Sequence, residues 1–394
     1  MFSLRVARGS RPTVLFRRLL VAGAAAGTGF LLLAILGYAV GHPGDSTSAL
    51  VRLGWCVIPS AVTVHLAVVV ARTEPNGRLR AGLVAAGLGQ RGLPLLAAAS
   101  TALNCVLGSA ISLVVFLHLR GDISGSPFDG AAAGVLGAGH PLPFAAALTL
   151  LAAVPLIAAT AAAVSLRPRQ AAPVPAEAEP EEDEEASPDG SGAPSAVRAP
   201  AGLPWGAALT AIGLTIEVSG DGPTHPGSLI PLPGGLGAVA PAVLAGWALT
   251  AVGMVLSGPG LTHALGRLIA VYHPGALRLL AGRALQEEAH RVGRPLGVLC
   301  TVASAAYAVA GRYGLGPLTG FATVLVAVCA TATALTATLE AKLARRHTTA
   351  ALIQLGASTA FLRNAAALRA AVLLAVVVPL AWIVAKFAAL PLGM

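Results

Sequence analysis

The sequence predicts an all-α, polytopic integral membrane protein, and three observations lead to this fold class. Of the 394 residues, 56% are hydrophobic and only 11% are charged, whereas about a quarter of an ordinary soluble domain is charged. The mean hydropathy is +0.77. The apolar residues gather in nine runs, most of them near the roughly 20 residues that cross a bilayer as a helix. We therefore expect about nine transmembrane helices.

The first half of the chain, residues 1–166, holds four predicted spans. Five arginines and no acidic residue precede the first apolar run. This run is longer than the core of an ordinary signal peptide, so we interpret it as a retained span. The connecting loops are short and rich in turn residues, which leaves no room for a folded domain. The spans are 19–40, 53–70, 93–119 and 144–166.

An acidic linker, residues 167–202, separates the two halves. Eight of the seventeen acidic residues lie between Glu177 and Asp189. The segment is dense in Pro, Ala, Glu and Ser and has no apolar periodicity, so we expect a disordered cytoplasmic linker. A solvated spacer is the favoured interpretation, and a tether for calcium or for a basic partner is the alternative.

The second half holds five predicted spans in three parts. A central transmembrane hairpin occupies 203–256, a basic amphipathic cytoplasmic segment occupies 257–295, and the remainder is 296–394. An offset of 269 residues aligns Gly87 with Gly356 and places the first three spans on the last three. We therefore expect two parallel quasi-repeats. The spans are 203–218, 236–256, 296–310, 318–339 and 370–390.

The basic residues predict the topology of these spans. If the amino terminus is cytoplasmic, the inner segments hold 22 of the 26 Lys and Arg residues. We therefore expect a multi-pass protein of the plasma (cell) membrane with a cytoplasmic amino terminus. We interpret the positive charge as a signal that sets the membrane topology. We expect membrane lipids as partners, and no nucleic acid.

Two basic, amphipathic segments lie between predicted spans on the inner side. The stronger one, 345–369, has Leu352, Leu355 and Leu362 at helical spacing beside several arginines. A weaker copy occupies 78–100. Helices of this kind are too polar to cross a bilayer, so we expect them at its inner surface.

The sequence ALIQLGAS, at 351–358, resembles the signature of the FtsX-like permease family. In that family a Leu-Gly-Ala-Ser turn follows a short cytoplasmic helix, and here the turn begins at Leu355 and Gly356. The weaker copy keeps Gly87, and 278–299 resembles the basic segment that leads into the second module of duplicated actinobacterial members. The resemblance implies an ABC transporter permease subunit with modules at 1–166 and 296–394.

The resemblance also implies a partner, a cytoplasmic ABC ATPase dimer that contacts both segments. The chain contains no GxxxxGK[ST] phosphate loop, so ATP would be bound by that partner, and we expect no cofactor in this chain. The alternative interpretation of both segments is a pair of interfacial helices anchored by arginine. The residues expected to couple to the ATPase are Arg78, Arg80, Leu83, Gly87, Arg345, Arg346, Leu352, Leu355 and Gly356.

Residues suited to chemistry are scarce. The spans contain His65, Asn104, His118 and Glu217, and an ionisable residue inside a membrane is a functional hypothesis by default. We interpret these four as interfacial or helix-pairing groups, with Glu217 and His118 near water at the outer ends. The sequence has no HExxH and no pattern of nucleophile and base, and its four cysteines lack CxxC spacing. We expect neither an enzyme nor a metal site.

Smaller features predict local contacts. Gly23 and Gly27 form a GxxxG pair that is typical of close helix approach. Glu287 with Arg291, four residues apart, and Glu340 with Arg345, five residues apart, suggest charge matching on a helix surface. The tripeptide at 120–122 reads Arg-Gly-Asp, like an integrin ligand, and we assign it no function.

Three functions remain open at this point. The first is an ABC permease subunit that exports or extracts a lipid, peptide or antibiotic. The second is a transmembrane signal element that a separate ATPase drives without transport. The third is an ion-coupled secondary carrier, which the scarcity of buried charge and the parallel repeat disfavour.

Overall fold

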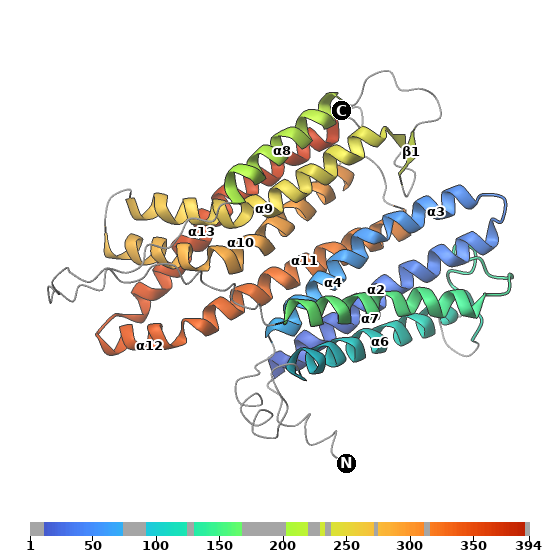
Figure 1. The fold of residues 1–394 in the computed structure, drawn as a ribbon, viewed down its shortest axis with the longest axis horizontal. Coiled ribbons are helices and arrows are strands. Elements are labelled where there is room, and N and C mark those ends of the chain that lie inside the picture. Colours follow the sequence, from blue (N-terminus) through green and yellow to red (C-terminus); the bar gives the residue numbers. More distant parts are fainter. Residues whose placement is uncertain are drawn as a thin grey trace, which may run out of the picture.

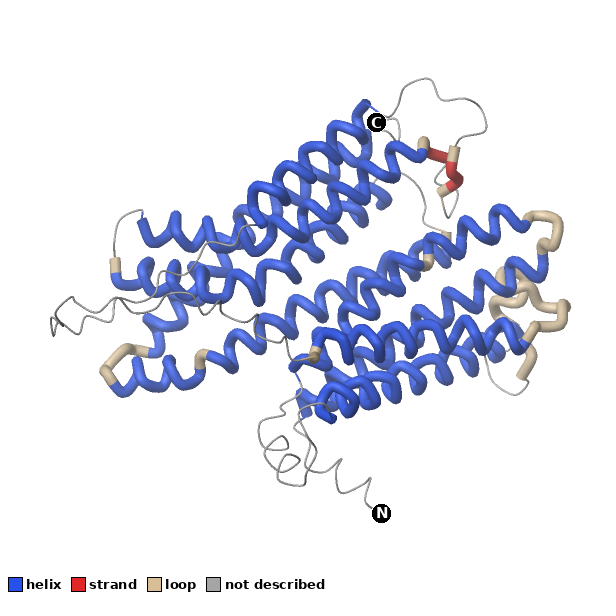
Figure 2. The backbone as a smooth tube through the Cα atoms, in the orientation of Figure 1, coloured by secondary structure: helices blue, strands red, loops and turns tan. Residues whose placement is uncertain are grey.

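The computed structural model describes residues 12–73, 92–123, 130–167, 202–219, 229–232, 238–271, 275–310 and 316–390. Nearly all of these residues are helical, so the predicted all-α class is confirmed. Figures 1 and 2 show long helices that run between two opposite ends of the molecule. The acidic linker lies almost entirely outside the described residues, and so do residues 78–91 of the weaker basic segment, with Arg78, Arg80, Leu83 and Gly87.

The described chain contains eleven helices and one small hairpin. The helices are α2 (Pro12–Gly41), α3 (Ser46–Trp55), α4 (Val57–Thr73), α6 (Gly92–Arg120), α7 (Phe144–Ser165), α8 (Gly202–Ser219), α9 (Pro241–Val271), α10 (Ala276–Ala310), α11 (Pro317–Ala344), α12 (Arg346–Gln354) and α13 (Thr359–Ala389). Strands β1 (Ile230–Pro231) and β2 (Ala238–Val239) pair antiparallel, with Ile230 opposite Val239.

Seven helical segments are long and apolar enough to cross a membrane, so a polytopic membrane protein is confirmed. They are α2, α3 with α4, α6, α7, α9, α11 and α13. Helix α8 is short and contains Glu217. Helix α10 has 35 residues, about 52 Å at 1.5 Å per residue, but its first half is basic and only 296–310 is apolar. The predicted nine spans include these two helices, and that count stays a prediction.

The helices form two bundles that lie side by side (Figure 1). In bundle I, α2, α4, α6 and α7 pack together with α11, and in bundle II, α8 and α9 pack with α10 and α13. Helix α11 follows α10 in the chain but packs against both α10 and α4. The predicted second module, 296–394, is therefore shared between the bundles in space. The module boundaries and the repeat stay predictions.

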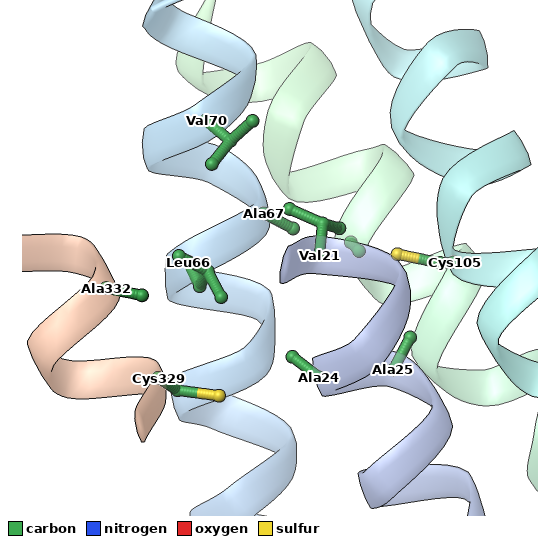
Figure 3. Packing of buried hydrophobic residues seen from close by; sticks show 10 residues of the cluster. Val21, Ala24, Ala25, Leu66, Ala67, Val70, Cys105, Cys329 and Ala332 are labelled. Carbon is green, nitrogen blue, oxygen red and sulfur yellow. The ribbon is translucent and has the colours of Figure 1, made fainter. Parts of the chain in front are cut away.

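Bundle I is filled by apolar side chains. Figure 3 shows where α2, α4, α6 and α11 meet, with the side chains of Val21, Ala24, Ala25, Leu66, Ala67, Val70, Cys105, Cys329 and Ala332. All four cysteines are free and buried, as expected of small apolar residues. The predicted GxxxG contact is wrong in part, because Gly23 is exposed while Gly27 faces Leu325.

Bundle II is held by a glycine seam, which we define as four pairs of facing glycines along α8, α9 and α10. A Cβ atom built on any of these glycines would come within 3 Å of its partner helix. Small residues allow helix backbones to approach this closely. The facing pairs are Gly206 with Gly253, Gly213 with Gly246, Gly258 with Gly293 and Gly266 with Gly282.

Charge separates the two ends of the molecule. The arginine-rich end is the one where α2 begins, α4 and α7 end, and α12 lies (Figure 1). The hairpin end is the opposite one, which carries β1 and β2. Arg17 and Arg18 lie near the start of α2, Arg72 in the last turn of α4 and Arg346 in the first turn of α12, whereas Arg120 ends α6 and Lys386 lies in the last turn of α13. This separation agrees with the predicted inner segments, while the membrane side that each end faces stays a prediction.

Candidate functional site

Helix α12 is a separate short helix with a rigid stop. At its end Gly356 adopts φ +93°, a left-handed conformation that glycine reaches without strain. The Gly356 N–H donates to Ile353 O and the Ala357 N–H donates to Leu352 O, each at 3.0 Å. This pair of bonds is the Schellman motif that terminates helices. The predicted glycine stop is therefore present.

The chain turns sharply from this stop into α13. Ser358 caps α13 by accepting a 3.2 Å hydrogen bond from the Phe361 N–H. The side chain of an N-cap serine satisfies a backbone donor that the helix itself leaves unpaired. Helix α12 is thus joined to α13 by a short, fully hydrogen-bonded connection. A displacement of α12 would be passed to α13 without a flexible loop between them.

The surface of α12 is open, and its apolar tip points away from the rest of the protein. Leu355 is 84% exposed and Ile353 is 46% exposed, while Leu352 is half-buried and Arg346 is exposed. Helix α12 contacts the end of α11. A leucine this exposed at a helix tip is an anchor available to a partner, since burial of such a side chain contributes about 1.5–3 kcal/mol.

The base of α12 is fixed by an ionic clamp, which we define as Arg345, Glu288 and Arg369. Arg345 Nη2 lies 2.6 Å from Glu288 Oε1 and donates to Ala284 O at 2.6 Å. Arg369 Nη1 lies 3.6 Å from the other oxygen, Glu288 Oε2. The clamp joins the junction of α11 and α12 to α10 and α13. The expected pairing of Arg345 with Glu340 is wrong, because Glu288 comes closer across the helix interface.

The clamp carboxyl is only 16% exposed. Burial raises the pKa of Glu288 above its ordinary 4.5, and the guanidinium of Arg369 offsets only part of this effect. Two arginines share one carboxylate, so the clamp keeps a net positive charge. A single acidic residue therefore orders two cations from different helices.

Glu340, near the end of α11, lies among arginines of both bundles. Its carboxylate interacts electrostatically with Arg17 of α2, Arg72 of α4 and Arg291 of α10. The Glu340 Oε1 atom is buried, and among the described residues it has no hydrogen-bond partner. Helix α11 packs against α2, α4 and α10, so this carboxylate lies in the electrostatic field of arginines from all three helices.

The predicted polar residues inside the spans lie apart from this site. Glu217 is fully buried, with 0% of its surface exposed, so the expectation that water reaches it is wrong. It has a helix-pairing contact, because the Thr250 hydroxyl of α9 donates to Glu217 Oε1 at 2.7 Å. His65, Asn104 and His118 are half-buried. None of the four approaches the clamp in the contacts of the described residues.

The arginine of the Arg-Gly-Asp tripeptide is buried, while Gly121 and Asp122 are exposed. Arg120 is 3% exposed, and its guanidinium donates to the carbonyl oxygens of Gly137 and His140 while lying 3.5 Å from Asp122. This buried arginine holds the loop that follows α6 against the bundle. These contacts give Arg120 a role in holding the loop.

No metal-binding cluster of His, Cys, Asp and Glu occurs among the described residues. A small cavity of about 20 Å³ lies between α9, α10 and α13, lined by Met254, Thr262, Cys300, Leu373 and Val377 among others. This volume accommodates about one water molecule.

Comparisons of the chain with protein-family models, with curated proteins and with solved structures found no match. The resemblance to FtsX-like permeases thus depends on the sequence around Gly356 and on the turn that this sequence forms. The sequence prediction found Arg345 and Gly356 but missed Glu288 and Arg369. Glu288 is one of two acidic residues in the basic segment 257–295, and Arg369 ends the segment 345–369. Neither position predicts the contact, because it depends on how three helices cross.

Proposed function

We propose that this chain is the membrane subunit of an ABC transporter, and that a separate cytoplasmic ATPase drives it through α12. The observation that carries the proposal is the exposed α12 with its glycine stop, Leu355 tip and clamped base. Those three features are what a lever needs: a contact point, a stiff arm and a fixed attachment.

The position of α12 explains how a force applied to it would act. Helix α12 connects α11, which packs in bundle I, to α13, which packs in bundle II. Displacement of α12 would therefore shift the bundles relative to each other. Because Glu288 of α10 contacts Arg345 in the clamp, α10 would move together with α12. A rigid helix moved by a partner is a common element of switching transitions.

The charge of the arginine-rich end supports its assignment to the cytoplasm. Positive residues are retained on the cytoplasmic side of a membrane. The same charge attracts an acidic partner surface and raises its association rate. On this basis the ATPase would offer an apolar groove for Leu355 with acidic residues at its margin. We place the chain in the plasma membrane.

The cargo is a lipid, peptide or antibiotic that moves between or beside the two bundles, by export or by extraction from the membrane. A second candidate function is an ATPase-coupled signal element that moves no cargo. The small size of the cavity between α9, α10 and α13 favours this candidate, because it holds about one water molecule. Both functions need the same contact at α12, and measurement of ATP-dependent substrate movement in vesicles separates them.

The test is a binding and hydrolysis measurement with matched variants of α12. The chain is purified in nanodiscs with ABC ATPases of its source cell, and stimulation of ATP hydrolysis is measured. L355D should lower affinity at least tenfold, because it places a charge in an apolar contact and loses at least about 1.4 kcal/mol. A350D is the control, since Ala350 is exposed on another face of α12. If no ATPase binds the wild-type chain, or if both variants bind equally well, the proposal is wrong.

A further inference from the structure

A single carboxyl group lies fully buried in bundle II, away from α12. Glu217 is in the last turn of α8, and its side chain is 0% exposed. Its Oε1 accepts a hydrogen bond from the Thr250 hydroxyl at 2.7 Å. Its Oε2 is buried and has no hydrogen-bond partner among the described residues. Within the described part of the chain, the Thr250 hydroxyl is thus the one hydrogen-bond partner of this acid.

The glycine seam explains why water is excluded from the carboxyl. A Cβ built on Gly246 would lie 2.8 Å from Glu217 Cγ and 2.9 Å from Gly213 O. Backbones of α8 and α9 therefore touch directly beside the acid. A contact this close leaves no channel between the helices for solvent, so the Glu217 carboxyl cannot be hydrated while the seam is closed.

Charged groups on the neighbouring helices do not neutralise the acid. Helices α9 and α13 pack against α8. On α9, His263 and Arg267 follow Thr250 by 13 and 17 residues, about 20 and 26 Å along the helix axis. On α13, Arg363 and Arg369 lie in the first third of the helix. Lys386 lies toward the hairpin end, but its Nζ is 5.8 Å from the ring centroid of Trp382 and 6.0 Å from that of Tyr307. No ion pair of Glu217 occurs among the described residues.

From this geometry we infer that Glu217 is a proton-binding site, with its carboxyl protonated while α8 and α9 are in contact. An unpaired carboxylate in an apolar interior costs so much solvation energy that such a group takes up a proton instead. Thr250 is a positioning residue, because its hydroxyl donates to Oε1 and leaves Oε2 to carry the proton. The ligand is a proton, since a single carboxyl and one hydroxyl are too few oxygens for a metal ion.

The site would exchange its proton when the seam opens at the hairpin end. Helix α8 ends at Ser219, two residues after Glu217, so a small separation of α8 from α9 admits water. Hydration would then stabilise the carboxylate and release the proton. Closing the seam would require the proton again. This inference does not depend on an ATPase, and it would link proton uptake to the state of bundle II whatever drives that bundle.

The test is infrared spectroscopy of the full chain in nanodiscs at neutral pH. A protonated carboxyl has a carbonyl stretching band that a carboxylate lacks. We expect this band in the wild-type protein and its loss in E217Q. T250V should keep the band and move it to higher frequency, because the carbonyl loses a hydrogen bond. E340Q is the control and should leave the Glu217 band unchanged.

Two results would overturn the inference. One is a wild-type spectrum at neutral pH without any protonated-carboxyl band. The other is a band that E217Q keeps, which would assign the proton to another acid. If E217Q fails to fold, the T250V frequency shift decides the question, since only a protonated group bonded to Thr250 responds to it. An unshifted band in folded T250V contradicts the inference.

Discussion

The two bundles are packed in different ways, although both consist of long helices of similar length. Bundle I interlocks side chains such as Leu33, Leu66 and Phe116, all nearly inaccessible to solvent, and its backbones touch only at separate glycines such as Gly108 and Gly37. Bundle II places glycine against glycine along three helices and buries a carboxyl beside that seam. Side chains of a core can adjust when one of them changes, whereas touching backbones cannot. The comparison indicates that bundle II is the less tolerant of substitution.

The bundles also connect to α12 in different ways. Bundle I reaches α12 through the continuous α11, with Arg345 alone between the two helices. Bundle II reaches it through the glycine stop at Gly356 and through the clamp at Glu288 and Arg369. The first connection is almost continuous helix, and the second depends on one left-handed backbone conformation and on a charge pair. The connection to bundle II should therefore be the easier one to break.

The largest expected effect is in the glycine seam. A Cβ added at Gly253 would lie 2.5 Å from Thr210 N and 2.8 Å from Gly206 O. G253A should lower the free energy of unfolding by about 3 kcal/mol, because a backbone contact cannot give way. G23A is the matched control, because nothing lies within 4 Å of a Cβ built on Gly23. Alanine should stabilise that helix by about 1 kcal/mol relative to glycine. Thermal unfolding in detergent micelles measures the stability of both variants. Equal stability of G253A and G23A would contradict the conclusion that bundle II is the less tolerant of substitution.

A smaller effect is expected at the clamp. R345M removes the closest partner of Glu288 and leaves a mostly buried carboxylate, at a cost of about 2 kcal/mol. Hydrogen exchange of 346–355 should become faster, since α12 loses its attachment to α10. R346M is the control, because Arg346 is exposed. If R346M accelerates exchange as much as R345M, the clamp does not hold α12.

The pH dependence of stability should show which effect on the pKa of Glu288 is larger, its burial or its pairing with arginine. Its pKa is raised above 4.5, chiefly by burial, so the folded protein binds the proton more tightly than the unfolded chain does. Compared with E288Q, the wild type should therefore gain stability as the pH falls through that raised pKa, and the gain should level off below 4.5. The difference in unfolding temperature between the two proteins measures this. A wild type that loses stability relative to E288Q on acidification would show that pairing outweighs burial.

Sequence reasoning reached local features of this molecule and missed those that depend on helix crossings. The short helix before Gly356 follows from its own residues, because Leu355 and Gly356 carry the signal for a helix stop. The partners Glu288 and Arg369 lie 57 and 24 residues from Arg345, and no periodicity connects them. Glu217 shows the same limit, since its position near the end of α8 predicted water, while the packing of Gly213 on Gly246 excludes it.

The smallest effect is expected at the glycine stop, where the connection to bundle II has one permitted backbone conformation. Nothing lies within 4 Å of a Cβ on Gly356, so the cost of G356A comes only from its φ of +93° and amounts to about 1 kcal/mol. G356N is the matched control, because asparagine tolerates the left-handed region better than alanine. G356A should increase hydrogen exchange at the end of α12 and lower ATPase stimulation, while G356N should retain most of both. Equal behaviour of the two variants would mean that the left-handed turn does not link α12 to α13.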